Sequence, residues 1–362
     1  MLKKFIFSAM FLLSIGNVLP AQTISVKEAA QLEIKIAQTP DDYDTRSKLL
    51  SYYQQGKTLA DKKSLQKHRL GLIQNNPQKA SYVILGVWVI EDKNKAEFIE
   101  LKKEWLKQLS KFKTDSEVRL NAADFLSVPE SEMAEKIYLE GETMDADFFW
   151  FPLRLLEFYN SKLDELELNS ELYDKPVNEA DRKLLLAKIV AQTQKGIAAL
   201  EKQDPPTKNE LTRKFLANQA VKSLELGDTK TANQAAVELS RNLIETKPQT
   251  GLYEYYRVAE SVKGRVLLKV GNLAGAKERL FSSITSITDM EGLPPIVDVR
   301  FVEELLIKEG AENVLKYLKL CENLNLEEDD RATIKKWQNL LLRGKVPKFS
   351  EYSFTIEKIL IL

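Results

Sequence analysis

The spacing of small residues within the stretch Glu260–Ser283 constrains the fold more than any other feature. Gly264, Gly271 and Ala276 lie seven and then five residues apart, and large apolar residues fill the positions around them. Small residues let two antiparallel helices approach closely, and Gly271 with Asn272 suits the turn between them. The stretch therefore predicts a helical hairpin, although an ordinary hairpin with a glycine turn has the same appearance.

A second copy of this spacing lies upstream. Ala220, Gly227 and Ala232 are again seven and five residues apart, and the two copies are separated by 44 residues. The intervening segment 246–251 contains Pro248, which is expected just after the end of a helix because proline does not continue one. Two copies at equal internal spacing favour a repeated helical hairpin over a single one.

Two weaker copies precede these. Ala122 and Ala134 bracket a turn at Pro129, and near the start of the chain the segment 39–77 predicts two helices separated by a turn at Gly56. The sequence thus predicts about four hairpins, of which two match well.

This spacing resembles the tetratricopeptide repeat, a helix–turn–helix unit that stacks into solenoids, although the usual period is 34 residues. The segment 301–349 is also similar to the C-terminal segments of exported, tetratricopeptide-like bacterial proteins. The resemblance implies an all-α, right-handed superhelix of antiparallel hairpins, an α-solenoid whose first helices line a concave surface. It implies no catalytic residue.

Composition and periodicity agree with an almost entirely helical chain. Of the 362 residues, 44% are hydrophobic and 29% are charged, which is typical of a folded protein with a charged surface. Apolar residues recur at helical offsets in 186–200 and 314–321, and alternation typical of strands is absent before the last dozen residues. Each of these amphipathic helices needs a partner to cover its apolar face.

The N-terminus predicts a targeting signal. Lys3 and Lys4 precede an apolar run over 5–19, and Pro20-Ala21 is followed by polar residues, which predicts a secretory signal peptide over 1–21. An uncleaved anchor is the alternative, but the run is shorter than the ~20 residues of a spanning helix. We therefore expect a mature protein without a transmembrane span, exported to the periplasm or beyond.

The rest of the chain is expected to divide into two helical parts and a tail. We predict tetratricopeptide-like hairpins over 22–160, a link over 161–180, further hairpins over 181–348, and an apolar C-terminal tail over 349–362. The tail is expected to dock on the last hairpin, because a free apolar terminus promotes aggregation. The alternative is an exposed segment that a partner extends as a strand.

Charge and rare residues exclude several classes of function. The full chain is neutral, and removal of residues 1–21 takes away two lysines and leaves a net charge of −2, which argues against nucleic acid as a partner. His68 and Cys321 are the single histidine and cysteine, so neither a histidine–cysteine zinc cluster nor an internal disulfide is expected. Cys321 lies on an apolar helix face. We expect no cofactor.

Catalytic motifs are also missing. The chain has neither the Gly-x-Ser-x-Gly elbow nor a phosphate-binding glycine loop. Asp145 and Asp147 precede the aromatic run 148–151, and carboxylates beside aromatic rings are used in glycan-binding and glycan-cleaving clefts. A helical glycan-binding protein or hydrolase is therefore one alternative. We favour the interpretation that both aspartates cap a helix whose aromatic residues enter the core, and we predict no enzyme.

The predicted function is a non-catalytic protein–protein interaction or scaffolding module of the bacterial cell envelope, which binds a protein or peptide in a helical groove. Its candidate groove residues open the first helices of two hairpins. A self-assembling structural subunit is a further alternative, and it would carry a large apolar surface patch. The candidate groove residues are Phe148, Trp150, Tyr253, Tyr256 and Arg257.

Overall fold

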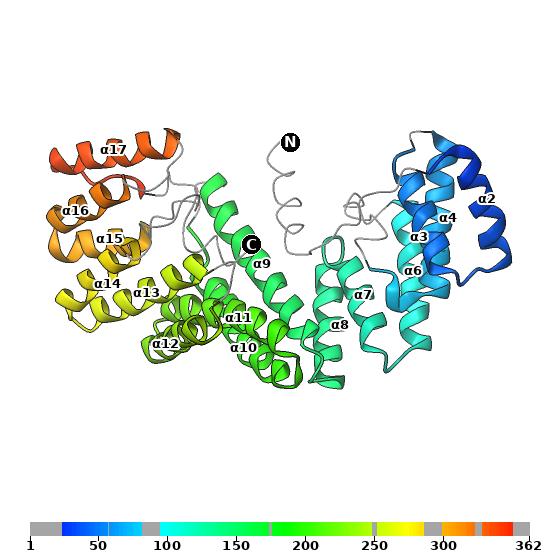
Figure 1. Cartoon of the computed structure of the whole chain (residues 1–362), viewed down its shortest axis with the longest axis horizontal. Coiled ribbons are helices and arrows are strands. Elements are labelled where there is room, and N and C mark those ends of the chain that lie inside the picture. Colours follow the sequence, from blue (N-terminus) through cyan, green and yellow to red (C-terminus); the bar gives the residue numbers. More distant parts are fainter. Residues whose placement is uncertain are drawn as a thin grey trace. The chain divides into compact units, whose positions relative to one another are not determined.

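The computed structural model describes residues 24–56, 58–81, 95–173, 176–247, 252–285, 299–322 and 328–349. The chain divides into two compact units, Met1–Phe158 and Tyr159–Leu362. Within the described residues every regular element is a helix, fifteen α-helices and two short 3₁₀-helices, and no strand occurs. The expected all-α fold is confirmed (Figure 1).

In the first unit, helices that are consecutive along the chain pack against one another from α2 to α8. Helix α9 begins in this unit and continues into the second. The elements are α2 (Val26–Gln38), α3 (Tyr43–Gln54), α4 (Leu59–Asn75), η1 (Pro77–Lys79), α6 (Ala96–Lys111), α7 (Ser116–Leu126), α8 (Ser131–Met144) and α9 (Trp150–Tyr173).

In the second unit, consecutive helices pack together from α10 to α14 and from α15 to α17, and contacts between alternate helices join these two runs. Helix α13 contacts both α11 and α15, and α14 contacts α16, which is the arrangement of a solenoid-like array. The elements are α10 (Glu179–Ala199), η3 (Leu200–Lys202), α11 (Pro205–Leu226), α12 (Thr229–Thr246), α13 (Leu252–Lys269), α14 (Leu273–Thr285), α15 (Val299–Glu309), α16 (Ala311–Cys321) and α17 (Glu328–Leu342).

Seven of the fifteen described α-helices begin where the side chain of the N-cap residue satisfies an otherwise unpaired backbone N–H of the first turn. Thr58 and Asp61 form a capping box at the start of α4, and two prolines open α11, where a missing N–H costs nothing. These local signals fix the helix starts independently of tertiary packing. The capping side chains are Ser25, Asp42, Thr58, Asp115, Asn178, Asp204 and Asp228.

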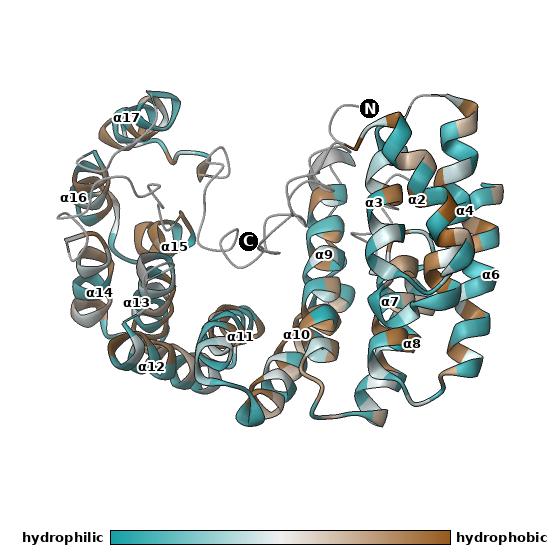
Figure 2. Ribbon diagram, turned by 45° about the vertical axis from the view of Figure 1, so that its right-hand side comes forward, coloured by the Kyte–Doolittle hydropathy of each residue, from teal (hydrophilic) through white to brown (hydrophobic). Residues whose placement is uncertain are grey.

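Hydrophobic residues hold the helices together, and the helices are two-sided in hydropathy (Figure 2). One core cluster joins α11, α12 and α13, and another joins α13 to α17. In the latter, Trp337 and Phe349 lie edge to face with ring centroids 4.9 Å apart, and both rings are fully buried. A smaller cluster holds α2 on α3.

The small residues of the two repeat copies occupy packing and turn positions. Ala220, Ala232 and Ala276 are fully buried. Gly227 and Gly271 have φ angles of 86° and 83° at helix C-termini, the left-handed conformation that glycine adopts without strain. Local sequence therefore specifies both turns.

The repeat spacing suggests that Gly264 lets the two helices of its own hairpin approach, but Gly264 also packs against a side chain of the following hairpin. A Cβ at this position would lie 2.4 Å from Cε1 of Phe301 on α15 and 3.1 Å from Cβ of Arg279 on α14. Its small size therefore accommodates a ring from the following hairpin as well as the neighbouring helix. The ring of Phe151 covers Gly141, and that of Phe215 covers Gly196, in the same way.

The boundary between the two parts differs from the expected link over 161–180. The compact units meet between Phe158 and Tyr159, and residues 161–173 form the second half of the continuous helix α9. The predicted signal peptide, residues 1–21, and residues 350–362 of the predicted tail lie outside the described residues. No helix in the described part of the chain is long and apolar enough to cross a membrane.

Candidate binding site: a charged cavity in the second unit

The aromatic run at the start of α9 divides between core and surface. Phe149 and Phe151 are buried, and Phe148 lies half-buried with its ring centroid 5.2 Å from that of Phe151. Trp150 is 37% exposed, and the guanidinium of Arg154 lies over its ring at 5.7 Å. Of the predicted groove residues in the first unit, Trp150 is therefore the one that faces solvent.

The predicted groove residues on α13 are mostly enclosed. Tyr256 packs half-buried against the core of α11, α12 and α13, and Arg257 is only 4% exposed. The side chain of Tyr253 lies outside the described residues. Arg257 was expected to line an open groove. It does not, because α11, α12, α14 and α15 contact α13 and leave little of the surface of α13 open.

Asp145 and Asp147 lie between α8 and α9 and take different positions. Asp145 is the C-cap of α8, and its Oδ2 accepts a hydrogen bond of 2.6 Å from the Ser116 hydroxyl. Asp147 is exposed in the turn before α9. The aspartates thus mark the turn between two helices, and the two buried rings that follow belong to the core, which favours packing over a glycan cleft.

A charged cavity of about 300 Å³ is the most elaborate site in the described part of the chain. It is formed where the last turns of α11 and α13 meet the first turns of α10 and α15. Four helices of the second unit thus contribute to one site. Its lining residues are Arg182, Leu224, Glu225, Arg265, Lys269, Arg300, Glu303 and Glu304.

Glu225 is the centre of the charged cavity. Its side chain is 3% exposed and pairs with Arg182 of α10, with Arg300 of α15 at 3.2 Å and with Lys222 of its own helix at 3.6 Å. Arg182 also bonds Glu167 of α9 at 3.0 Å. One buried carboxylate therefore ties three helices of the second unit together.

The cationic neighbours keep Glu225 ionised. Burial alone raises the pKa of a carboxyl group, but the charges of Lys222, Arg300 and Arg182 lower the pKa of Glu225 to about 2. The attraction of three cations therefore exceeds the cost of desolvation. Glu225 is therefore a fixed negative charge that is held among cations.

The other side of the charged cavity carries a second ion pair and a lysine at the rim. Arg265 donates two hydrogen bonds to the carboxylate of Glu304, at 2.8 and 3.2 Å, which fixes the fork geometry of the guanidinium. Lys269, in the last turn of α13, is exposed. Among the described residues its ammonium group has no ion-pair partner.

A separate polar cluster attaches α2 to α3 and α4. The carboxylate of Glu33 accepts hydrogen bonds from Tyr53 at 3.0 Å and from Lys67 at 2.9 Å, and it lies 2.7 Å from Nε2 of His68. His68 is fully buried and stacks on Tyr53. Burial lowers the pKa of His68, whereas Glu33 opposes this shift. The single histidine thus has a structural partner.

Another buried cluster joins α7, α8 and α9. The hydroxyl of Tyr138 donates a 2.5 Å hydrogen bond to Asp124, and Nε of Arg154 lies 3.4 Å from the same carboxylate. Burial raises the pKa of Asp124, and the charge of Arg154 opposes the rise. These groups lie on facing helices and line neither the charged cavity nor the hollow along α8, so we assign them to packing.

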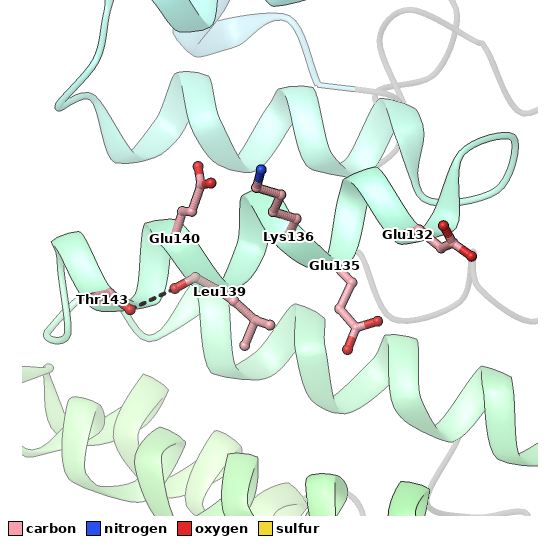
Figure 3. A pocket seen from close by; sticks show the side chains of 6 residues that line it. All are labelled: Glu132, Glu135, Lys136, Leu139, Glu140 and Thr143. Atoms are coloured by element: carbon pink, nitrogen blue, oxygen red, sulfur yellow. Dashed lines mark hydrogen bonds between the residues drawn. The ribbon is translucent and has the colours of Figure 1, made fainter. Parts of the chain in front are cut away.

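A shallow hollow of about 560 Å³ lies along α8 in the first unit. All six of its lining residues come from this one helix, and Figure 3 shows Lys136 and Glu140 pointing to one side while Glu135 and Leu139 point to the other. Thr143 bonds the backbone of its own helix. Side chains that diverge from a single helix do not converge on a ligand, so this hollow is a poor candidate.

Comparison with known proteins gives no family assignment. No family model matches the chain, and no curated protein matches it significantly. Among the described residues, no group of three or more histidine, cysteine and carboxylate side chains has the arrangement of a metal site. Function is therefore inferred from the charged cavity itself.

The sequence did not reveal this site. Arg182, Glu225, Arg265 and Arg300 span more than a hundred residues, and each lies in a charged helix face that alone resembles ordinary solvated surface. The one available signal was positional. Glu225 lies two residues before Gly227, and Lys269 lies two residues before Gly271, so the repeat alignment places both at the C-terminal ends of first helices.

Proposed function

We propose that the protein is a non-catalytic binding module that holds a peptide or a protein segment at the charged cavity of its second unit. The observation that carries this proposal is a cavity built by four helices with charged side chains fixed by ion pairs. Fixed charges in a concave site orient a polar partner and exclude mismatched ones. The tetratricopeptide-like repeat spacing favours the same class of function.

The chemistry of the charged cavity favours binding over catalysis. A general acid or base works best when its pKa lies near the operating pH, whereas the pKa of Glu225 is about 2. Arginine stays protonated and does not exchange protons near neutral pH. Glu225 and the arginines therefore supply fixed charge rather than proton transfer, which favours a scaffold over a hydrolase.

The two alternatives have less support in the described residues. A glycan cleft would need Asp145 and Asp147 to face the aromatic rings, but Asp145 bonds Ser116 instead. A self-assembling subunit would need a large apolar patch. On α12 the exposed large apolar residues are Val237 and Ile244, which share one face of the helix, and two side chains do not make a large patch. The charged cavity is therefore a better organised site than either the glycan cleft or the apolar assembly surface.

The location in the cell envelope is a proposal that rests on the sequence of residues 1–21 alone. Cleavage after Ala21 would leave Gln22 as the first residue of the mature protein. N-terminal sequencing of the protein recovered from outside the cytoplasm checks this. An intact Met1 on protein retained in the cytoplasm would contradict export.

Selection from a random peptide display library tests the binding proposal. We expect the full-length protein to enrich a set of related peptides, and we expect the charge reversal Lys269→Glu to abolish their binding. Lys335→Glu is the matched control, because Lys335 is an exposed lysine of the same unit on α17 and does not line the charged cavity.

The outcome separates the alternatives. Peptides that bind the wild type and Lys335→Glu but not Lys269→Glu support a peptide site at the charged cavity. Failure to enrich any peptide, or enrichment that is unaffected by Lys269→Glu, would sink the proposal. Circular dichroism of both variants shows whether each retains its helical content.

A further inference from the structure

We propose that the partner segment is acidic, and that one of its carboxylates enters the charged cavity between Lys269 and Arg300. This inference rests on the proposed binding function and adds the chemical class of the partner. The described side chains at the charged cavity carry it, through their charges, their exposure and their existing ion pairs.

The charged cavity holds more cationic than anionic groups. Arg182, Arg265, Lys269 and Arg300 line it together with three carboxylates, and Lys222 adds a fifth cation against Glu225. Glu167, which does not line the charged cavity, also forms an ion pair with Arg182. Even with Glu167 included, the cations outnumber the carboxylates within the described residues.

The cations with the most exposed side chains mark where an incoming charge would bind. Lys269 is exposed and has no ion-pair partner among the described residues, and the Arg300 side chain is 34% exposed. Arg300 also lies in the first turn of α15, an eleven-residue helix whose N-terminus carries positive partial charge. An added carboxylate at this position gains from all three contributions.

A basic partner would meet three carboxylates that already have partners; Glu303, the third, also has an interaction among the described residues. Glu225 is 3% exposed and already pairs with three cations, so an incoming lysine would not reach it without displacing one of them. Glu304 is held by both hydrogen bonds of Arg265. The charged cavity therefore favours an anion.

Fluorescence anisotropy with the full-length protein measures this preference. The probes are dye-labelled hexaglutamate, hexaglutamine and hexalysine. Each peptide is also tested as an unlabelled competitor, which shows whether the protein binds the peptide rather than the dye. We expect hexaglutamate to bind and the other two not to bind. Binding should weaken as ionic strength rises, because exposed charges are screened by salt.

Variants at one rim position connect the binding to the cavity. We expect the affinity for hexaglutamate to fall in the order wild type, Lys269→Gln, Lys269→Glu, with at least a tenfold loss for the charge reversal. Lys335→Glu should bind as the wild type does. Lys269 is exposed, so each variant should keep its helical content, and circular dichroism verifies this.

Other results would overturn the inference. These are no binding of hexaglutamate, equal binding by Lys269→Glu, or preference for hexalysine. Competition of inorganic phosphate with hexaglutamate would support an anion site. If the protein binds inorganic phosphate but does not bind hexaglutamate, an acidic peptide is contradicted as the partner. If library peptides that depend on Lys269 are neutral or basic, the binding function stands and the acidic partner fails. If no peptide is enriched, the binding function itself fails.

Discussion

At the scale of single residues, this protein uses buried polar groups to join its helices. His68 is fully buried against Glu33 and Tyr53, and Glu225 is buried among three cations. The pair of His68 and Glu33 links α4 to α2, and Glu225 links α11 to α10 and α15. A buried charge is costly without a partner, so removal of one member should cost more than loss of a surface ion pair.

The His68 cluster predicts a pH dependence of the first unit. The groups that face His68 are Glu33 from α2, Arg46 and Tyr53 from α3, and Lys67 from its own helix. Burial lowers the pKa of His68 below its ordinary 6.5, so the unfolded state binds a proton more readily. Stability is therefore fully present above about pH 6.5 and declines as the pH falls toward the lower pKa of the folded state.

Glu33 extends this loss to lower pH. Burial raises the pKa of Glu33, but hydrogen bonds from Lys67 and His68 lower it from 4.5 to about 2, so its contribution is lost between those values. Hydrogen exchange of α2 and α4 between pH 7.5 and 5.5 measures the His68 part. We expect lower protection factors, which are corrected for the intrinsic pH dependence of amide exchange, at pH 5.5 than at pH 7.5, and a flatter profile in His68→Gln. An equal pH dependence in His68→Gln would contradict the assignment.

At the scale of elements, glycines have two separate roles in this fold. Gly227 and Gly271 end helices in the left-handed conformation, and a Cβ there would meet nothing within 4 Å. Gly141, Gly196 and Gly264 lie inside helices, where a phenylalanine ring from a later helix covers each of them. The first role is conformational and the second is steric.

Substitutions distinguish these two roles. Gly227→Val should cost about 1–2 kcal/mol of unfolding free energy through the left-handed backbone, and Gly227→Asn should cost less because asparagine tolerates this conformation. Gly196→Ala places a Cβ 2.2 Å from Cζ of the fully buried Phe215 and should cost about 1–3 kcal/mol.

Denaturant unfolding of these variants provides the measurement, and a double variant provides the control. The cost of Gly196→Ala should shrink when Phe215 is replaced by leucine, because the ring that it meets is gone. Equal costs in both backgrounds would show that Phe215 does not determine the requirement for glycine at position 196.

The sequence predicted the local features of these elements better than the contacts between them. The turns at Gly227 and Gly271 follow from their own neighbourhood, and the helical periodicity of 186–200 and 314–321 matches α10 and α16. The ring over Gly264 comes from residue 301 and was not predicted. Arg257 was expected to line an open groove because it lies near the start of the first helix of a hairpin, whereas four neighbouring helices bury it.

At the scale of the whole molecule, the chain is two compact all-α units that share the continuous helix α9. In the second unit, alternating contacts among helices stack the hairpins and bring the first turns of α10 and α15 to the last turns of α11 and α13. The charged cavity is thus a product of stacking rather than of any one hairpin. For this reason no single motif in the sequence identified it.

Hydrogen–deuterium exchange of the full-length protein, with and without a peptide selected from the display library, tests the central claim most directly. The claim is that the charged cavity is where a partner binds. We predict added protection at the last turns of α11 and α13 and the first turns of α10 and α15, with no change in α2 to α8. Protection centred elsewhere, such as on α8 or at Trp150, or protection that persists in Lys269→Glu, would contradict the account.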